Sequence, residues 1–188
     1  VFKKLVYKSG QRFGNKLYTL EMLDSNKEYM PNNFWIPDSI LSVGGSIEGF
    51  TIPKVNGINL YSFLENKNIK PKDKLFYLKK IGEMLNQLSY IRKTTSLKDF
   101  YINDLNVTNF IVTPSNCELS IIDLDSAKIG TNAACPARLL TPKALLNNVK
   151  GKYNINEDED VLGHVIADEN SELFITYLYV FFLQESLL

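Results

Sequence analysis

The sequence predicts an α+β fold in two lobes, a small β-rich lobe followed by a mainly helical one. Strand and hairpin patterns dominate before Pro53, whereas the longest amphipathic helix pattern lies after Gly57. The chain has 188 residues, 45% of them hydrophobic, which is enough to bury a substantial core. We therefore divide it into an N-lobe (1–53), a hinge (54–57) and a C-lobe (58–188).

The composition argues against several classes of protein. A formal net charge of zero gives no basic field that would favour nucleic acid. The apolar run from Leu173 to Leu183 is too short to span a bilayer and is typical of a buried helix. Cys117 and Cys135 suggest neither a disulfide framework nor a metal site, so we expect a cytoplasmic protein. Because the chain starts at Val1 without methionine and stops inside an apolar run, we also expect that one or both ends have been cut.

A strand and a helix are expected in the first 24 residues. Val1–Tyr7 has the character of a strand. Asn15–Asp24 carries leucines at three-residue spacing, which indicates a short helix with one buried face; these are Leu17, Leu20 and Leu23. Glu21 falls within this helix, where the simplest interpretation is a solvated charge. The alternative is a partner for Lys3 or Lys4, which requires that lysine to point inward.

A hairpin and a connector are expected next. Two apolar runs, Ile40–Val43 and Ile47–Ile52, flank Gly44-Gly45, which is a strong signal for a two-residue hairpin turn. Pro53 ends the second strand because proline cannot donate to a ladder. The residues through Gly57 then continue as an extended connector.

The pattern becomes helical after the connector. Leu60–Leu64 predicts one or two helical turns, and Pro71 precedes the clearest helix of the chain. Apolar residues recur there every three or four positions and form one stripe: Leu75, Leu78, Ile81, Leu85, Leu88 and Ile91. The lysines of this helix are expected on its solvated side: Lys72, Lys74, Lys79 and Lys80.

The segment after this helix carries the strongest signal for function. Asp104 and Asn109 are five residues apart, and Asp123 follows Asp104 by nineteen. Two β-rich runs on either side of Pro114–Cys117 predict an antiparallel hairpin, whose open end makes Asn109 and Asp123 neighbours. Two carboxylates and an amide placed there could orient a hydroxyl and hold a hard cation against phosphate oxygens.

Together these segments resemble the protein kinase-like superfamily, and the resemblance covers nearly the whole chain. Ile102–Asn109 (INDLNVTN) is similar to the catalytic loop H-R-D-L-x-x-x-N, and Ile121–Lys128 is similar to the strand and D-F-G segment that follow it. Phe50–Gly57 resembles the fifth strand and hinge, and Leu75–Ile91 the helix before the catalytic loop. Val1–Leu5 is similar to the strand that carries the ATP-binding lysine. We expect a divergent, microbial or viral member.

The resemblance implies a role for each candidate residue. Asp104 would orient the substrate hydroxyl, and Asn109 and Asp123 would hold Mg²⁺. Lys3 would contact the α- and β-phosphates of ATP, and Glu21 would fix its ammonium group. Further residues would surround the adenine: the backbone of Lys54 and Val55, and apolar walls from Ile52 and from Leu119 or Ile122. The implied activity is transfer of the ATP γ-phosphoryl group to a protein hydroxyl, as in serine/threonine kinases, with ATP and Mg²⁺ as cofactors.

Some expected cations are missing from this pattern. Ile102-Asn103 stands where the family has His-Arg, which removes the usual anchor for a phosphorylated activation segment. Neither Asn106 nor Thr108 supplies a cation near the γ-phosphate. These changes keep the metal site and the base but reduce the positive charge around them.

Other departures lie after the hairpin. Asp125 occupies the glycine position of D-F-G, and Glu172, on a segment resembling the start of a buried helix, stands where an aspartate is customary. Arg138 could pair with a substrate or with Glu172. The segment from Gly130 to Asp168 carries no A-P-E signature, and no glycine-rich loop is present in the sequence.

Two alternative functions remain open. A small-molecule kinase of the aminoglycoside or choline type shares the fold and these acidic positions, but Gly130-Thr-Asn132 replaces its usual G-D-P. A pseudokinase that senses nucleotide or acts as a scaffold is favoured by the missing catalytic-loop cation. The intact set of Asp104, Asn109 and Asp123 argues against that reading.

Overall fold

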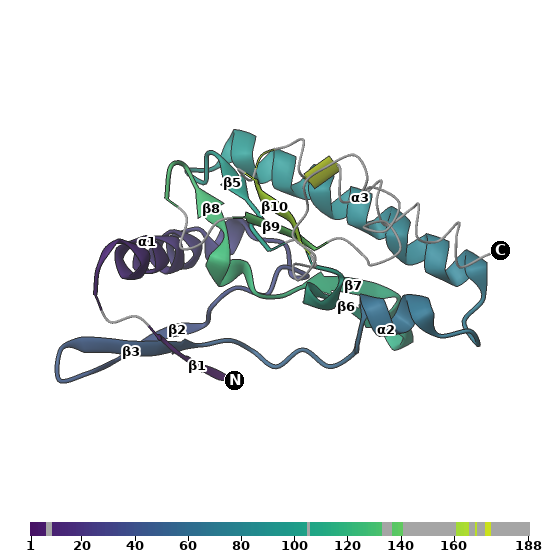
Figure 1. The fold of residues 1–188 in the computed structure, drawn as a ribbon, viewed down its shortest axis with the longest axis horizontal. Helices are drawn as coiled ribbons and strands as arrows, with labels where there is room; N and C mark the ends of the chain where they lie inside the picture. The colour runs from purple at the N-terminus through teal and green to yellow at the C-terminus, as the bar shows by residue number, and fades with distance from the viewer. Residues whose placement is uncertain are drawn as a thin grey trace.

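The computed structural model describes residues 1–6, 9–104, 106–132, 137–140, 161–165, 168 and 172–173. These residues form helices and small antiparallel sheets, so the predicted α+β class is confirmed. Figure 1 shows the long helix α3 (Pro71–Thr94) along one side and strands β1 (Phe2–Lys4), β2 (Ser39–Val43) and β3 (Ser46–Thr51) on the opposite side. The shorter strands lie between them. The division into two lobes stays a prediction.

The first sheet has the order β1-β3-β2, and both pairings are antiparallel. The predicted hairpin is confirmed, because β2 and β3 are joined by Gly44 and Gly45 with φ values of 57° and 82°. Both angles suit a two-residue hairpin turn. Strand β1 approaches β3 closely at Gly49, where an added Cβ would lie 2.3 Å from the carbonyl oxygen of Lys3. Gly49 therefore permits the pairing that positions Lys3.

Helix α1 (Gln11–Ser25) confirms the predicted early helix but begins four residues sooner. The helix includes Gly14 and follows Gly10, whose φ of 85° is accessible to glycine. Leu20 and Leu23 are fully buried. A 3₁₀ turn at Lys27–Tyr29 follows the helix.

The long helix α3 is confirmed, with Pro71 in its first turn, where proline's missing N–H costs nothing. Its buried face is rotated from the predicted stripe. Leu75 is 58% exposed, whereas Lys74, predicted to be solvated, is 6% exposed. The buried set is Lys74, Tyr77, Leu78, Ile81, Met84, Leu88 and Ile91. Lys74 lies three and four residues before Tyr77 and Leu78, so helical geometry places it on their face.

The strands between α3 and the first sheet form two small sheets. One has the order β4-β6-β7, from Ile58–Asn59, Phe110–Thr113 and Glu118–Ile121. The other pairs β5 (Phe100–Tyr101) with β8 (Lys128–Ile129). Helix α2 (Leu60–Glu65) confirms the predicted short helix, and Asn59 caps it by accepting a hydrogen bond from the Ser62 amide.

Two further strands, β9 (Ala137–Leu140) and β10 (Val161–Val165), pair antiparallel. The side chains of Arg138 and His164, most of the expected activation segment and nearly all of the apolar run from Leu173 to Leu183 lie outside the described residues. In the part that is described, no helix is both long and apolar enough to cross a membrane.

The buried hydrophobic residues form two clusters. The larger core surrounds α3 and extends through β6 and β7 to Ile129. The smaller core consists of Leu5, Leu20, Phe50 and Ile52. Helix α1 contributes Leu20 to the small core and Leu23 to the large one, so it connects them.

Candidate functional site

The hairpin of β6 and β7 brings Asn109 and Asp123 together at its open end, as the sequence predicts. Phe110 is opposite Ile121 in the ladder, and the Ile122 amide donates a 2.9 Å hydrogen bond to the Asn109 carbonyl. The turn at the other end is a 3₁₀ turn, Pro114–Asn116, followed by Cys117 with a φ of 55°. The two candidate metal ligands are therefore positioned by adjoining strand ends.

Asp104 and Asn109 are joined directly. The Asn109 Nδ2 group donates to the Asp104 carbonyl at 3.0 Å and to its Oδ2 at 3.1 Å. Asn109 is only 7% exposed, so this amide is held in one orientation. Because Nδ2 is used by Asp104, Oδ1 is the Asn109 atom suited to bind a cation. Asn106 caps the following 3₁₀ turn by accepting a hydrogen bond from the Thr108 amide at 3.0 Å, so its side chain stabilises the loop.

Asp123 lies in the left-handed region of backbone space, with φ 63° and ψ 30°. This conformation is uncommon outside glycine, although aspartate tolerates it better than most residues. It ends the strand abruptly and starts a 3₁₀ turn, Leu124–Ser126, in which the Ser126 hydroxyl donates to the Asp123 carbonyl at 3.1 Å. Strained backbone of this kind occurs often at functional sites.

Lys3 reaches this site from the first sheet. Its Nζ lies 2.5 Å from Asp123 Oδ1 and 3.2 Å from Asp125 Oδ1. Lys16, on α1, pairs with the other oxygen of Asp125, Oδ2. Lys3, to which the resemblance assigns the ATP phosphates, thus lies beside the predicted metal-binding aspartate. Lys16 was not among the residues that the sequence singled out.

Glu21 is not brought to Lys3. Its side chain is exposed on α1, and the lysine's ion pairs within the described chain are with Asp123 and Asp125. The helix faces the site with Lys16 and Thr19, both upstream of Glu21. The carboxylate that the resemblance expects from the helix comes instead from Asp125, and the helix contributes a lysine.

The charged groups of this site shift the pKa values of Asp125 and Lys3. Burial alone would raise the pKa of the Asp125 carboxyl, but the ammonium groups of Lys16 and Lys3 outweigh burial and hold that pKa below its ordinary value. Burial likewise would lower the pKa of Lys3, but Asp125 and Asp123 outweigh it and raise that pKa. Asp125 and Lys3 are therefore both charged at neutral pH.

A cavity of about 240 Å³ opens beside these charges. Its lining is Lys3, Lys4, Leu5, Val6, Arg12, Phe13, Lys16, Phe50, Asp125 and Ser126. Four of these residues are cationic and one is anionic. The cavity is therefore suited to an anionic group.

The predicted adenine-binding residues lie on the segment after β3 and on β7. Ile52 is 6% exposed, and Leu119 of β7 is 2% exposed, so both belong to apolar cores. Lys54 is exposed and Val55 half-buried on an extended segment without ladder pairing. Gly57 allows this segment to pass close to β6, because a Cβ there would lie 2.6 Å from the Val112 carbonyl oxygen.

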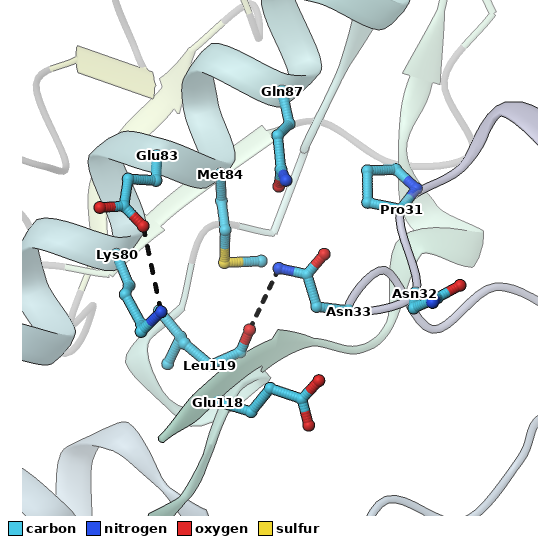
Figure 2. Close-up of a pocket in the computed structure, with 9 residues that line it drawn as sticks. All are labelled: Pro31, Asn32, Asn33, Lys80, Glu83, Met84, Gln87, Glu118 and Leu119. Atoms are coloured by element: carbon cyan, nitrogen blue, oxygen red, sulfur yellow. Dashed lines mark hydrogen bonds and ion pairs between the residues drawn. The ribbon is translucent and has the colours of Figure 1, made fainter. Parts of the chain in front are cut away.

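A second cavity, of about 260 Å³, lies between α3 and the segment before β2 (Figure 2). Asn33 points across it and donates from Nδ2 to the Leu119 carbonyl at 3.2 Å. Lys80 and Glu83 of α3 form an ion pair at 4.0 Å on the opposite wall. None of the predicted site residues other than Leu119 lines this cavity, so it is separate from the Lys3–Asp123 site.

Glu172 anchors the loop that carries Asp104. It is 1% exposed, and its Oε2 lies 3.0 Å from Arg92 Nη1. Its Oε1 accepts from the Ile102 amide at 3.4 Å. The sequence left Arg138 open as a partner of Glu172 or of a substrate, and the Arg138 side chain lies outside the described residues. The partner that the structure shows for Glu172 is Arg92, on the last turn of α3.

The donor chemistry suits Mg²⁺. Asp123 offers a carboxylate whose side chain is 38% exposed and already binds a cationic group, and Asn109 offers an amide oxygen. Mg²⁺ is usually bound through one or two such oxygens, with water and phosphate completing the shell. Among the described residues no group of three or more His, Cys, Asp or Glu side chains is gathered to hold a metal. Phosphate oxygens would therefore have to supply part of the coordination.

No protein-family model matches the chain, and no curated protein is significantly similar to it. The case for function therefore depends on the geometry of the site.

Proposed function

We propose that this chain is an ATP-dependent phosphotransferase of the protein kinase-like type, which transfers the γ-phosphoryl group of ATP to a protein hydroxyl in the cytoplasm. The observation that carries the proposal is the 2.5 Å contact between Lys3 and Asp123, 120 residues apart, at the strand end beside the Asp104–Asn109 pair. A lysine, a metal-binding aspartate and a hydrogen-bonded Asp–Asn pair are the groups that phosphoryl transfer requires.

Each of these residues has its own role in the proposed reaction. Asp104 orients the substrate hydroxyl and accepts its proton as the oxygen bonds to the γ-phosphorus and the bond to ADP breaks. Lys3 exchanges Asp123 for the phosphate oxygens, which frees that carboxylate for the metal. Asn109 and Asp123 would hold Mg²⁺, which would stabilise the charge on the phosphates. The segment 54–57 acts as the hinge between two lobes and receives the adenine.

Labelled phosphate transfer tests this proposal. We would incubate the protein with γ-labelled ATP and Mg²⁺, and with generic protein and small-molecule acceptors, beside the Asp104→Asn variant. The variant should lose transfer by about 100-fold or more, because it lacks the positioned base, but should still bind nucleotide. The matched control is Asp24→Asn, which changes an exposed aspartate paired with Lys27 at 3.1 Å and should leave transfer unchanged.

The outcomes separate the candidate functions. Transfer to small molecules alone would indicate an aminoglycoside- or choline-type kinase. A pseudokinase, favoured by the use of Asn106 as a loop cap, would show no transfer but would gain about 2.7 kcal/mol of stability at a hundred times the Kd of ATP. If the protein showed no transfer and no nucleotide-dependent stabilisation, the nucleotide site itself would be contradicted.

A further inference from the structure

A single carboxylate, that of Asp125, is shared by two lysines from different elements. Lys3 of β1 contacts Oδ1 at 3.2 Å, and Lys16 of α1 contacts Oδ2. The side chain of Asp125 is 8% exposed and that of Lys16 19% exposed. Salt screens such partly buried charges less than charges on the open surface. The attraction within these pairs is therefore less sensitive to salt than that of an ordinary surface ion pair.

Helix α1 is held against the Asp125 turn at more than one point. Thr19, three residues after Lys16 and so on the same helix face, donates to the Ala127 carbonyl at 3.3 Å. The Lys16 ammonium also lies 5.7 Å from the centroid of the Phe50 ring, a favourable position for a cation. Lys16 is thus fixed by the fold on the cavity side of α1.

A count of charges shows what Lys16 contributes. Asp123 and Asp125 together would more than neutralise Lys3, whereas the addition of Lys16 gives two ammonium groups for two carboxylates. When Asp123 binds a divalent cation, Lys3, Asp125 and Lys16 are left with a net charge of +1. Without Lys16, Lys3 and Asp125 would cancel, and the cavity would attract phosphate less strongly.

We propose that Asp125 and Lys16 are positioning residues for Lys3 in ATP binding. Asp125 holds Lys3 in the role that the resemblance assigned to Glu21, and Lys16 fixes the Asp125 carboxylate and offsets its charge, so that the site keeps a net positive charge for the phosphates. This inference rests on the proposed function, because it concerns the same nucleotide site.

Titration of Mg²⁺-ATP by calorimetry tests the inference. Lys16→Met should weaken binding about tenfold, the cost of one charge-assisted contact. Lys16→Arg keeps the charge and the contact with Asp125, and it should bind within about threefold of the unaltered chain. Lys27→Met is the matched control, because it removes an exposed lysine from an ion pair outside the cluster; its affinity should not change.

A double-mutant cycle distinguishes positioning from direct contact with ATP. In an Asp125→Asn background Lys16 has no carboxylate to hold in place beside Lys3, so adding Lys16→Met should change affinity by less than about threefold. A circular dichroism melt without nucleotide checks that each variant is folded. If Lys16→Met does not fold, Lys16→Gln replaces it in the cycle.

Failure of the inference differs from failure of the proposed function. If the unaltered chain does not bind Mg²⁺-ATP, both are wrong. If it binds, and Lys16→Met binds equally well or loses the same affinity with and without the Asp125 carboxylate, the inference alone is overturned.

Discussion

The two hydrophobic cores differ in size and in the kind of site residue that each supports. Within the described chain the large core holds 21 buried residues and the small core four. Asp104, Asn109 and Asp123 lie on segments that leave the large core, whereas Lys3 and Lys16 lie on β1 and α1 beside the small one. The acidic and amide half of the site therefore has the firmer support.

This difference suggests how the site works. Burial of apolar area is the main source of stability, so a four-residue core fixes its surroundings less firmly than one five times larger. Under the proposed function, Lys3 would move from Asp123 to the phosphates when nucleotide and metal bind, while the carboxylates would stay in place. The ion pairs among Lys3, Lys16, Asp123 and Asp125 join the two regions.

The largest effect is expected in the large core. Leu88→Ala removes a fully buried side chain of α3 and should lower the free energy of unfolding by about 2–5 kcal/mol, through lost transfer energy and a cavity. Urea denaturation measures this loss. Leu75→Ala is the control on the same helix; because Leu75 is 58% exposed, its effect should stay within about 0.5 kcal/mol. Equal losses in the two variants would mean that the buried face of α3 is assigned wrongly.

A smaller effect is expected from Gly49→Ala, which acts on the small core. The added Cβ would lie 2.3 Å from the Lys3 carbonyl oxygen, so β1 must move away from β3. We expect a loss of about 1–3 kcal/mol in stability, typical of overpacking, together with weaker ATP binding because Lys3 moves with β1. Denaturation and calorimetry report the two effects.

Gly14→Ala is the matched control for that variant. Gly14 lies on α1 with no atom within 4 Å of an added Cβ, so alanine should raise stability by up to about 1 kcal/mol. An unchanged ATP affinity in Gly49→Ala would show that β1 does not set the position of Lys3.

The smallest effect concerns pH and the link between the two regions. The pKa of folded Asp125 is held below its ordinary value of 3.8, so its contribution to stability is present above pH 3.8 and is lost as pH falls through the lower folded pKa. The Lys3 pKa is raised above 10.5, so that contribution is complete below pH 10.5 and is lost as pH rises through the folded pKa.

Asp125→Asn should therefore flatten the acid side of a stability-versus-pH curve measured by urea midpoints. Asp24→Asn, which alters an exposed pair, should keep the slope of the unaltered chain. An acid slope unaffected by Asp125→Asn would contradict the assigned ion pairs.

Local patterns determined much of this protein. The glycine pair and its flanking apolar runs were enough to predict the β2–β3 hairpin, since both glycines adopt the positive φ that this turn requires. The hairpin around Pro114–Cys117 was likewise predictable, and with it the approach of Asn109 to Asp123. Interactions between residues close in sequence fix these features.

Only the tertiary structure decided the partners of the charged groups. Apolar spacing gives a helix but not its rotation, so Lys74 was expected in solvent and Leu75 in the core. In the same way, the resemblance assigned Glu21 to Lys3, while the face of α1 that packs against the Asp125 turn presents Lys16. Ion pairs between residues 109 to 122 positions apart depend on how β1, α1 and β7 pack together, and no local preference encodes that packing.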